Sequence, residues 1–303
     1  METLKTLYAR HDRSYQENRY IYPVLSRRAG GISIGINLNP DKGCNFDCVY
    51  CQVDRTPEGM KGIDTLHQPV LIPRLLSELD HLVEEVLTGR IFLSPPFESV
   101  PLHLRKIADM ALSGDGEPTM VGDFLPVLDE LLNFRSRNAS RTGIPIRLIT
   151  NGTGLFRSSV RLALRERLSL SGPSGNSADE IWFKIDAADP ESFRRIDRSA
   201  IPFARYWSSI TETLKELPVT IQTMVCEIRD PDAPFDPMGE WKDSMKERFR
   251  KLLDGGALIR EWHLYTVARK PPEPSIIPLS PDRMESLRQF FQKTVNLPVR
   301  VFS

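Results

Sequence analysis

The chain has 303 residues, of which 40% are hydrophobic, and its 40 basic side chains balance its 40 acidic ones. This length can bury a substantial core in one large domain or two small ones, and zero net charge disfavours a dedicated nucleic-acid binder. The first residues lack the apolar core of a secretory signal, and no stretch has the apolar length that spans a bilayer. We therefore expect a cytoplasmic protein without a membrane partner, and the few cysteines fit that reducing compartment.

Apolar spacing predicts alternating strands and helices after a polar N-terminal extension of residues 1–30, which is rich in Tyr and Arg. Alternating patterns predict six strands, at Ile32–Asn37, Ile107–Ser113, Ile146–Asn151, Glu180–Asp186, Val219–Cys226 and Glu261–Tyr265. Helical patterns are found at Pro73–Leu87, Phe124–Phe134, Ser159–Arg167, Tyr206–Leu217, Trp241–Leu253 and Pro281–Val295. Ser280 is expected to be the N-cap of the last helix and Pro281 its first residue.

This repetition of strand and helix is expected of βα units around a parallel sheet. Six units predict an α/β fold with a partial TIM-like barrel that is open on one side. We assign residues 31–269 to this barrel, between the N-terminal extension and a C-terminal segment. That last segment, residues 270–303, is expected to be a proline-rich linker and a helix packed on the barrel.

The alternation of side chains along the strands predicts a polar lumen. In the strand that ends at Asp186 the apolar residues share one face, which leaves Trp182, Lys184 and Asp186 on the other. The corresponding faces of the next two strands carry Thr220, Gln222, Met224, Cys226, Glu261, His263 and Tyr265. A lumen of this kind leaves polar groups unsatisfied unless water or ligand fills it. We therefore hypothesise that the lumen is the reaction chamber.

Three cysteines, Cys44, Cys48 and Cys51, share one short loop with C-x3-C-x2-C spacing. Three thiolates can bind three irons of a cubane cluster and leave the fourth iron open to a small molecule. Structural zinc usually needs four ligands, commonly two Cys-x-x-Cys pairs, and no second pair follows. Three clustered cysteines cannot all form disulfides, and Cys226 lies alone in an apolar run. The spacing therefore favours an iron–sulfur cluster.

Further motifs accompany these cysteines. Tyr50 precedes the last of them, and Ser113–Thr119 has the sequence SGDGEPT. Together these motifs resemble those of the radical S-adenosylmethionine (SAM) enzymes, and the resemblance covers most of the chain. Four shorter runs are similar to a subgroup of uncharacterised Fe–S oxidoreductases related to the wyosine-forming tRNA enzymes. These runs are Ser26–Arg28, Phe183–Ala187, Arg194–Arg198 and Tyr265–Arg269.

The resemblance implies a [4Fe-4S] cluster and S-adenosyl-L-methionine as cofactors. It implies that the open iron binds the amino and carboxylate groups of SAM and that reductive cleavage yields methionine and a 5′-deoxyadenosyl radical. This radical would abstract hydrogen from an unidentified substrate, either a small molecule or a nucleotide-like compound. An external donor such as flavodoxin or ferredoxin would supply the electron.

The resemblance also gives roles to residues that bind the cofactors. The three cysteines would bind the cluster, and Tyr50 would pack against or hydrogen-bond adenine, unless it is an ordinary core aromatic. The glycine motif would hold the amino group of SAM through one of its two carboxylates, although alone such a motif is a tight turn. Its residues are Gly114, Asp115, Gly116 and Glu117.

Residues on later strands are assigned to SAM and to the substrate. Asn151 would contact the carboxylate or ribose of SAM, or it would simply end a strand in an Asn-Gly turn. Lys184 and Asp186 would contact the ribose or the substrate, or they would form only a buried ion pair. With Gln222, they are the candidate catalytic residues.

Other functions compete with this reading. A wyosine-type tRNA-base modifier would use a lysine such as Lys184 to form a Schiff base with a carbonyl substrate, and basic side chains to meet phosphates. Two sets of arginines could contact phosphates, although charged residues grouped in this way usually just face solvent. One set is Arg157, Arg161 and Arg165, and the other is Arg194, Arg195 and Arg198. An Fe–S electron carrier would need a fourth cysteine ligand in the loop. A zinc-binding interaction module would hold zinc instead of iron.

Overall fold

The computed structural model describes residues 7–8, 13, 15–66, 68–137, 143–170, 179–232, 234–268 and 273–302. The chain divides into two compact units. The first comprises Met1–Gly43, Gly62–Ile149 and Glu166–Glu180, and the second comprises Cys44–Lys61, Thr150–Arg165 and Ile181–Ser303. No helix in the described part of the chain combines the length and the apolar character that a bilayer crossing requires.

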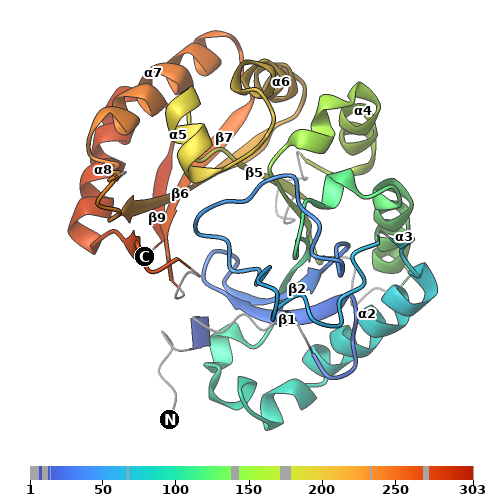
Figure 1. Ribbon diagram of the computed structural model, residues 1–303. Coiled ribbons are helices and arrows are strands. Elements are labelled where there is room, and N and C mark those ends of the chain that lie inside the picture. The colour runs from blue at the N-terminus through green and yellow to red at the C-terminus, as the bar shows by residue number, and fades with distance from the viewer. Residues whose placement is uncertain are drawn as a thin grey trace. The chain divides into compact units, whose positions relative to one another are not determined.

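The first unit contains the strands β1 (Ile21–Ser26), β2 (Gly31–Ile36), β3 (Ile107–Leu112) and β4 (Ile146–Thr150). β1 is antiparallel to β2, whereas β2, β3 and β4 are parallel neighbours in chain order. The helices of this unit are α2 (Ile72–Leu87) and α3 (Phe124–Ser136). α2 contacts β1, β2 and β3, because its buried leucines and valines recur at helical spacing along one face (Figure 1).

β1 lies in the segment that the sequence indicated as an extension, where no strand was expected. Pro23 occupies the middle of this strand, and it is tolerated because β1 forms the edge of the sheet. Ile21, Tyr22 and Leu25 are buried, so β1 contributes to the core of the first unit. Gly30 makes the turn to β2 with a φ of 73°, in the left-handed region that glycine enters without strain.

The second unit contains the strands β5 (Glu180–Lys184), β6 (Val219–Ile228), β7 (Ile259–Thr266), β8 (Ile276–Pro278) and β9 (Val299–Phe302). β5, β6, β7 and β9 are parallel neighbours in chain order, and β8 is antiparallel to β6. The helices that belong wholly or mostly to this unit are α4 (Ser158–Arg167), α5 (Pro190–Ile196), α6 (Phe203–Glu216), α7 (Glu240–Asp254) and α8 (Pro281–Thr294). Parallel strands that follow one another in chain order are typical of barrels.

Aromatic packing fixes two helices on one face of β7. The indole of Trp262 is fully buried and stacks on Phe249 of α7, with ring centroids 3.9 Å apart. It also contacts Phe291 of α8 at 4.3 Å. Since side chains alternate along a strand, the opposite face of β7 is left to Glu261, His263 and Tyr265.

The expected strands and helices are all present, with bounds that differ by a few residues. Ser280 is the N-cap of α8, with its side chain accepting a hydrogen bond from the backbone N–H of Arg283, and Pro281 is the first residue of that helix, as predicted. The sequence did not predict β1, α5, β8 or β9, and the last three are too short to show a period. Short 3-10 helices were also not predicted; they occur at Arg90–Leu93, Phe97–Ser99, Leu102–Leu104, Pro118–Met120 and Thr153–Phe156. Residues 269–272, which include most of the predicted linker, lie outside the described residues.

Candidate functional site

The loop that carries the three cysteines is held by backbone hydrogen bonds within the second unit. The N–H of Asp47 donates to the carbonyl of Asp197 at 3.1 Å, and the N–H of Val49 donates to the carbonyl of Ile196 at 2.9 Å. A turn tightens the loop, because the N–H of the third cysteine donates to the carbonyl of the second at 2.8 Å. Contacts with the end of α5 thus define the course of the loop.

Asn45 provides a further anchor for the same loop. Its Nδ2 donates to Thr153 Oγ1 at 2.7 Å, and its Oδ1 accepts from Asn151 Nδ2 at 3.0 Å. Asn151 Oδ1 in turn accepts from the N–H of Thr153 at 3.0 Å. The backbone carbonyl of Asn45 accepts from Ser199 Oγ at 3.1 Å. The side chain of Asn151, which was expected to meet the cofactor, therefore also braces the cysteine loop.

The arrangement of the thiols fits a cluster better than a single zinc ion. Cys44 is exposed, Cys48 and Cys51 are half-buried, and none of the three forms a disulfide within the described part of the chain. Four sulfurs around one zinc, each about 2.3 Å from the metal, lie about 3.8 Å from one another. Among the described residues, the three potential ligands gathered within 4.8 Å are Cys48, Asp186 and Asp197, a set with only one sulfur. Thiols spread along a loop instead suit a cluster in which each one binds a different iron.

The two half-buried thiols have differently charged neighbours. Cys48 Sγ lies 3.9 Å from Asp197 Oδ1, whereas Cys51 Sγ accepts a hydrogen bond from Arg55 Nη1 at 3.4 Å. Burial, reinforced by the Asp197 carboxylate, raises the pKa of Cys48 well above its usual value. Burial and the neighbouring Asp186 also raise the pKa of Asp197. Acidic groups therefore lie near one thiol and a guanidinium near another.

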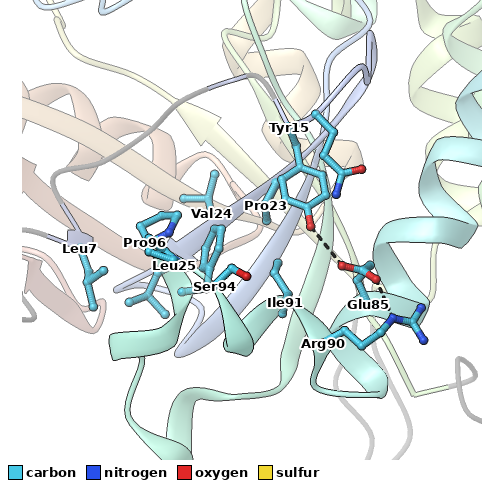
Figure 2. A pocket seen from close by; sticks show the side chains of 13 residues that line it. Leu7, Tyr15, Pro23, Val24, Leu25, Glu85, Arg90, Ile91, Ser94 and Pro96 are labelled. Carbon is cyan, nitrogen blue, oxygen red and sulfur yellow. Dashed lines mark hydrogen bonds and ion pairs between the residues drawn. The ribbon is translucent and has the colours of Figure 1, made fainter.

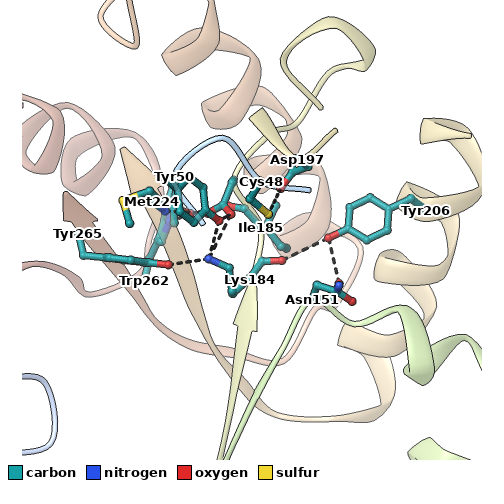
Figure 3. Close-up of polar contacts among 12 residues, drawn as sticks. Cys48, Tyr50, Asn151, Lys184, Ile185, Asp197, Tyr206, Met224, Trp262 and Tyr265 are labelled. Carbon is teal, nitrogen blue, oxygen red and sulfur yellow. Dashed lines mark hydrogen bonds and ion pairs between the residues drawn. The ribbon is translucent and has the colours of Figure 1, made fainter. Parts of the chain in front are cut away.

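A polar network surrounds Lys184 in the second unit (Figure 3). Its ammonium donates to the hydroxyls of Tyr50 at 2.6 Å and of Tyr265 at 2.7 Å, and it forms an ion pair with Asp186 at 3.3 Å. Tyr50 also donates to Asp186, and the other carboxylate oxygen of Asp186 accepts from the N–H of Met224 at 2.7 Å. The network thus places Tyr50, which belongs to the cysteine motif, beside two of the candidate catalytic residues.

The network determines the charge of its members. Burial by itself would lower the pKa of Lys184, but Asp186 and then Tyr265 outweigh it, and the pKa is raised. Burial and the Asp186 carboxylate raise the pKa of Tyr50 well above its usual value. Lys184 is therefore an ammonium ion and Tyr50 a neutral phenol across the physiological pH range.

The predicted polar face is not turned towards solvent. The side chains of Lys184 and Asp186 are 20% and 1% exposed, and Gln222 is 1% exposed. Gln222 lies in register with Lys184 of β5 and with His263 of β7. The imidazole of His263 also packs against Trp182, at 6.0 Å between ring centroids. Buried polar groups on three neighbouring strands therefore share one region of the second unit.

The glycine motif lies in the first unit, where its glycines are required by packing. Gly114 has a φ of 151°, and a Cβ at this position would lie 2.3 Å from Asn37 Oδ1. A Cβ on Gly116 would lie 1.9 Å from the carbonyl oxygen of Gly43. Both glycines thus allow close packing inside the unit, in addition to any role in approaching a ligand.

The two carboxylates of the motif have different surroundings. Asp115 Oδ1 accepts from Arg13 Nη1 at 2.5 Å, and Asp115 Oδ2 accepts from Asn37 Nδ2 at 2.7 Å. Glu117 is 3% exposed, and its Oε1 accepts from the N–H of Thr119 at 3.1 Å. Both oxygens of Asp115 are therefore used inside the first unit.

The arginine sets that could meet phosphates are partly occupied by internal partners. Arg161 is buried, and its ion pair with Glu216 has a distance of 2.8 Å. Arg198 pairs with Glu273, and Arg195 pairs with a glutamate one turn earlier in α5. These contacts reduce the positive charge that either set can present to a nucleic acid.

A cavity of about 360 Å³ lies in the first unit, beside β1 and the 3-10 helix at Arg90–Leu93 (Figure 2). Its lining combines apolar side chains with the polar residues Tyr15, Gln16, Glu85, Arg90 and Ser94. The carboxylate of Glu85 accepts from the Tyr15 hydroxyl at 3.3 Å and from Arg90 Nε at 2.7 Å. None of the site residues predicted from the sequence is among the described residues that line this cavity.

Three residues of the site, Asn45, Arg55 and Asp197, were not assigned a place in it from the sequence. Asn45 and Arg55 lie in or just after the cysteine motif, so a closer reading of its intervening residues could have found them. Asp197 lies in one of the runs that carry the subgroup resemblance, and Tyr265, which lies in another, was expected on the lumen face. The signal was present in those runs, but without the fold nothing related them to the cysteines.

Comparisons with known proteins bear on the whole arrangement. A family model described as the radical SAM superfamily matches residues 38–238. A UPF0026 protein of Methanocaldococcus jannaschii is 31% identical over 183 residues, which are 58% of this chain and 43% of that protein. The chain spans about half the length of the curated relatives that it matches.

Solved structures with similar folds have low sequence identity to this chain. The structure of TYW1 with a lysine–pyruvate adduct bound has a TM-score of 0.52 and 16% identity, covering 92% of this chain and 85% of that one. A radical SAM methyltransferase from Sphaerobacter thermophilus has a TM-score of 0.58 and 12% identity, covering 93% of this chain and 68% of that one. These likenesses confirm the α/β fold with a partial TIM-like barrel that the sequence predicted.

Proposed function

Because the chain belongs to the radical SAM superfamily and is an enzyme of SAM-dependent radical chemistry, we propose that it cleaves SAM reductively at a [4Fe-4S] cluster. The resemblance that the motifs indicated is confirmed at the level of the family. The proposed product is a 5′-deoxyadenosyl radical that abstracts hydrogen from a substrate. The observation that carries this proposal is the anchored loop with three cysteines at C-x3-C-x2-C spacing, in a chain whose only other cysteine is Cys226.

We assign the cluster to Cys44, Cys48 and Cys51. When bound, it would supply the electron and an open coordination position for SAM, and an external flavodoxin or ferredoxin would reduce it. The cysteine loop is hydrogen-bonded to the end of α5 and, through Asn45, to Thr153 and Asn151, and these contacts hold its course. The protein thereby presents the thiols in advance, which lowers the ordering cost of binding.

We propose that Tyr50 contacts the adenine of SAM and that Lys184 and Asp186 hold the Tyr50 ring in place. Lys184 and Asp186 both hydrogen-bond its hydroxyl, so its ring cannot turn away without breaking a buried ion-pair network. We propose that Lys184, Asp186 and Gln222 line the chamber for SAM and substrate and restrict the entry of water.

We propose that the glycine motif holds the amino group of SAM through the carboxylate of Asp115 or of Glu117. The Asp115 carboxylate neutralises the Arg13 guanidinium and accepts from Asn37, so an ammonium group there would have to share these partners. Glu117 Oε1 accepts a hydrogen bond from the backbone N–H of Thr119. An ammonium group suits either carboxylate.

A wyosine-type activity is the second candidate function, and two observations disfavour it. A lysine that forms an adduct with pyruvate must be a neutral amine, whereas Asp186 keeps Lys184 protonated by raising its pKa. The arginines that could meet tRNA phosphates are partly paired with carboxylates. Borohydride trapping with pyruvate should therefore leave Lys184 unmodified.

Anaerobic reconstitution with iron and sulfide, followed by dithionite and SAM, tests the main proposal. The expected products are 5′-deoxyadenosine and methionine. Cys48→Ala should abolish their formation. Cys226→Ala should retain it, because this cysteine is buried in β6 outside the loop.

Each competing function predicts a different result in the same preparation. Zinc in place of iron would support an interaction module and contradict the proposal. A cluster that reduces and reoxidises without consuming SAM would indicate an electron carrier. Retention of the protein on immobilised tRNA that weakens as salt is added would support the wyosine-type alternative.

A further inference from the structure

Arg55 lies four residues after Cys51 and touches its thiol. The guanidinium Nη1 donates to Cys51 Sγ at 3.4 Å. We propose that Arg55 is a positioning residue that raises the reduction potential of the metal centre through Cys51. This inference rests on the proposed function, because it requires that Cys51 bind a cluster.

The turn around Arg55 is built from its immediate neighbours. Asp54 Oδ1 accepts from the N–H of Thr56 at 3.0 Å and from its hydroxyl at 2.6 Å. The N–H of Gly59 donates to Thr56 Oγ1 at 3.2 Å. A Cβ at position 59 would lie 2.2 Å from the Asp54 carboxyl carbon, so this turn requires a glycine at that position. Arg55 is therefore held between two residues of a compact turn.

The expected effect follows from charge. Reduction adds an electron to a cluster, and a nearby cation or N–H donor to a ligating sulfur stabilises the more negative state. A guanidinium serves well, because it stays protonated at every relevant pH. Beside Cys48 lie the acidic residues Asp197 and Asp186, which offer no positive charge to stabilise a reduced cluster. Lys184 and Arg198 also act on Cys48 electrostatically, whereas Arg55 is a cation that donates a hydrogen bond directly to a thiol of the loop.

Redox titration of the reconstituted protein, followed by electron paramagnetic resonance, tests this role independently of catalysis. At a fixed applied potential, Arg55→Gln should lower the ratio of reduced to oxidised cluster about tenfold, which corresponds to about 59 mV for one electron. Arg55→Lys should lower this ratio less, because it keeps the charge but loses the planar donor. Lys251→Gln removes a charge from the exposed last turn of α7 and should titrate like the wild type. The shift in Arg55→Gln should be the same at pH 7 and pH 9.

Iron and sulfide are measured before each titration, so that the two proposals can fail separately. A wild-type protein without iron contradicts the proposed function itself. A fully loaded Arg55→Gln protein with the wild-type midpoint overturns the role of Arg55 and leaves the proposed function intact. If Arg55→Gln holds no iron, Arg55→Lys decides the matter: a lowered midpoint supports the role, and an unchanged one overturns it.

Discussion

Substituting Lys184 by methionine measures the energy of the buried network around Asp186. The change removes an ammonium that donates to two tyrosine hydroxyls and pairs with Asp186 at 3.3 Å, while it keeps most of the side-chain volume. The Asp186 carboxylate is 1% exposed and cannot gain water in compensation. The variant therefore leaves a buried charge without its counter-ion.

Breaking a buried ion pair from one side costs about 3–5 kcal/mol. Asp186 retains hydrogen bonds from Tyr50 and from the N–H of Met224, so we expect the lower end, about 3 kcal/mol. In Lys184→Met/Asp186→Asn the stranded charge is absent. The double variant should therefore lose less than the sum of the single variants, by about 1–3 kcal/mol.

Tryptophan fluorescence during urea unfolding is a suitable assay, because Trp182, Trp207, Trp241 and Trp262 all belong to the second unit. The measurement uses cluster-free protein, in which metal binding adds nothing to stability. A loss below about 1 kcal/mol, or additivity of the two changes within about 0.5 kcal/mol, would refute the proposed coupling between Lys184 and Asp186.

The sign of the pH dependence follows from the raised pKa of Lys184. Its contribution is fully present below the unfolded pKa, for which the ordinary value is 10.5, and it is lost as pH rises through the higher folded pKa. The cost of Lys184→Met should therefore be constant between about pH 6 and pH 9. A cost that disappears within this range would mean that Lys184 is not charged in the folded protein.

Three further predictions test other parts of the structure. Gly152→Ala should destabilise the second unit by more than about 2 kcal/mol in the same assay, because φ is 83° and the new Cβ would lie 2.1 Å from the ring of Phe183. Burial raises the pKa of Cys226 to about 12, so iodoacetamide at pH 8 should leave it unlabelled by mass spectrometry until the protein is unfolded. Hydrogen bonds from an arginine and a glutamine along α8 lower the pKa of Glu285 to about 2, so carboxyl NMR should find it still ionised at about pH 3.5 and protonated only as the pH approaches that pKa.

The longer elements of the fold could be predicted because their signals lie within one segment. Helix α2 repeats buried side chains at helical spacing, and β5 alternates apolar with polar residues, so each pattern identified its element. β1 was not predicted because a proline such as Pro23 argues against a strand unless the strand lies at the edge of a sheet. The seven residues of α5 are too few to show a face, although Asp189 caps the helix and Pro190 begins it.

The site, like the fold, could be predicted only where the evidence lies within one segment of the chain. The alternation along β5 placed Lys184 and Asp186 on one face, and the structure joins them in an ion pair. The interpretation of Asp115 was left open between two carboxylates, because its contact with Arg13 spans 102 residues. No local pattern encodes a contact of that separation.

The sequence by itself determined the three-cysteine spacing, the family and the order of strands and helices, since each depends on residues within a few positions of one another. The tertiary structure alone decided what surrounds the thiols. Asp197 reaches Cys48 from 149 positions along the chain, and Lys184 reaches Tyr50 from 134. Such neighbours meet only when the cysteine loop packs on the end of α5 and on β5, and no pattern within one segment encodes that packing.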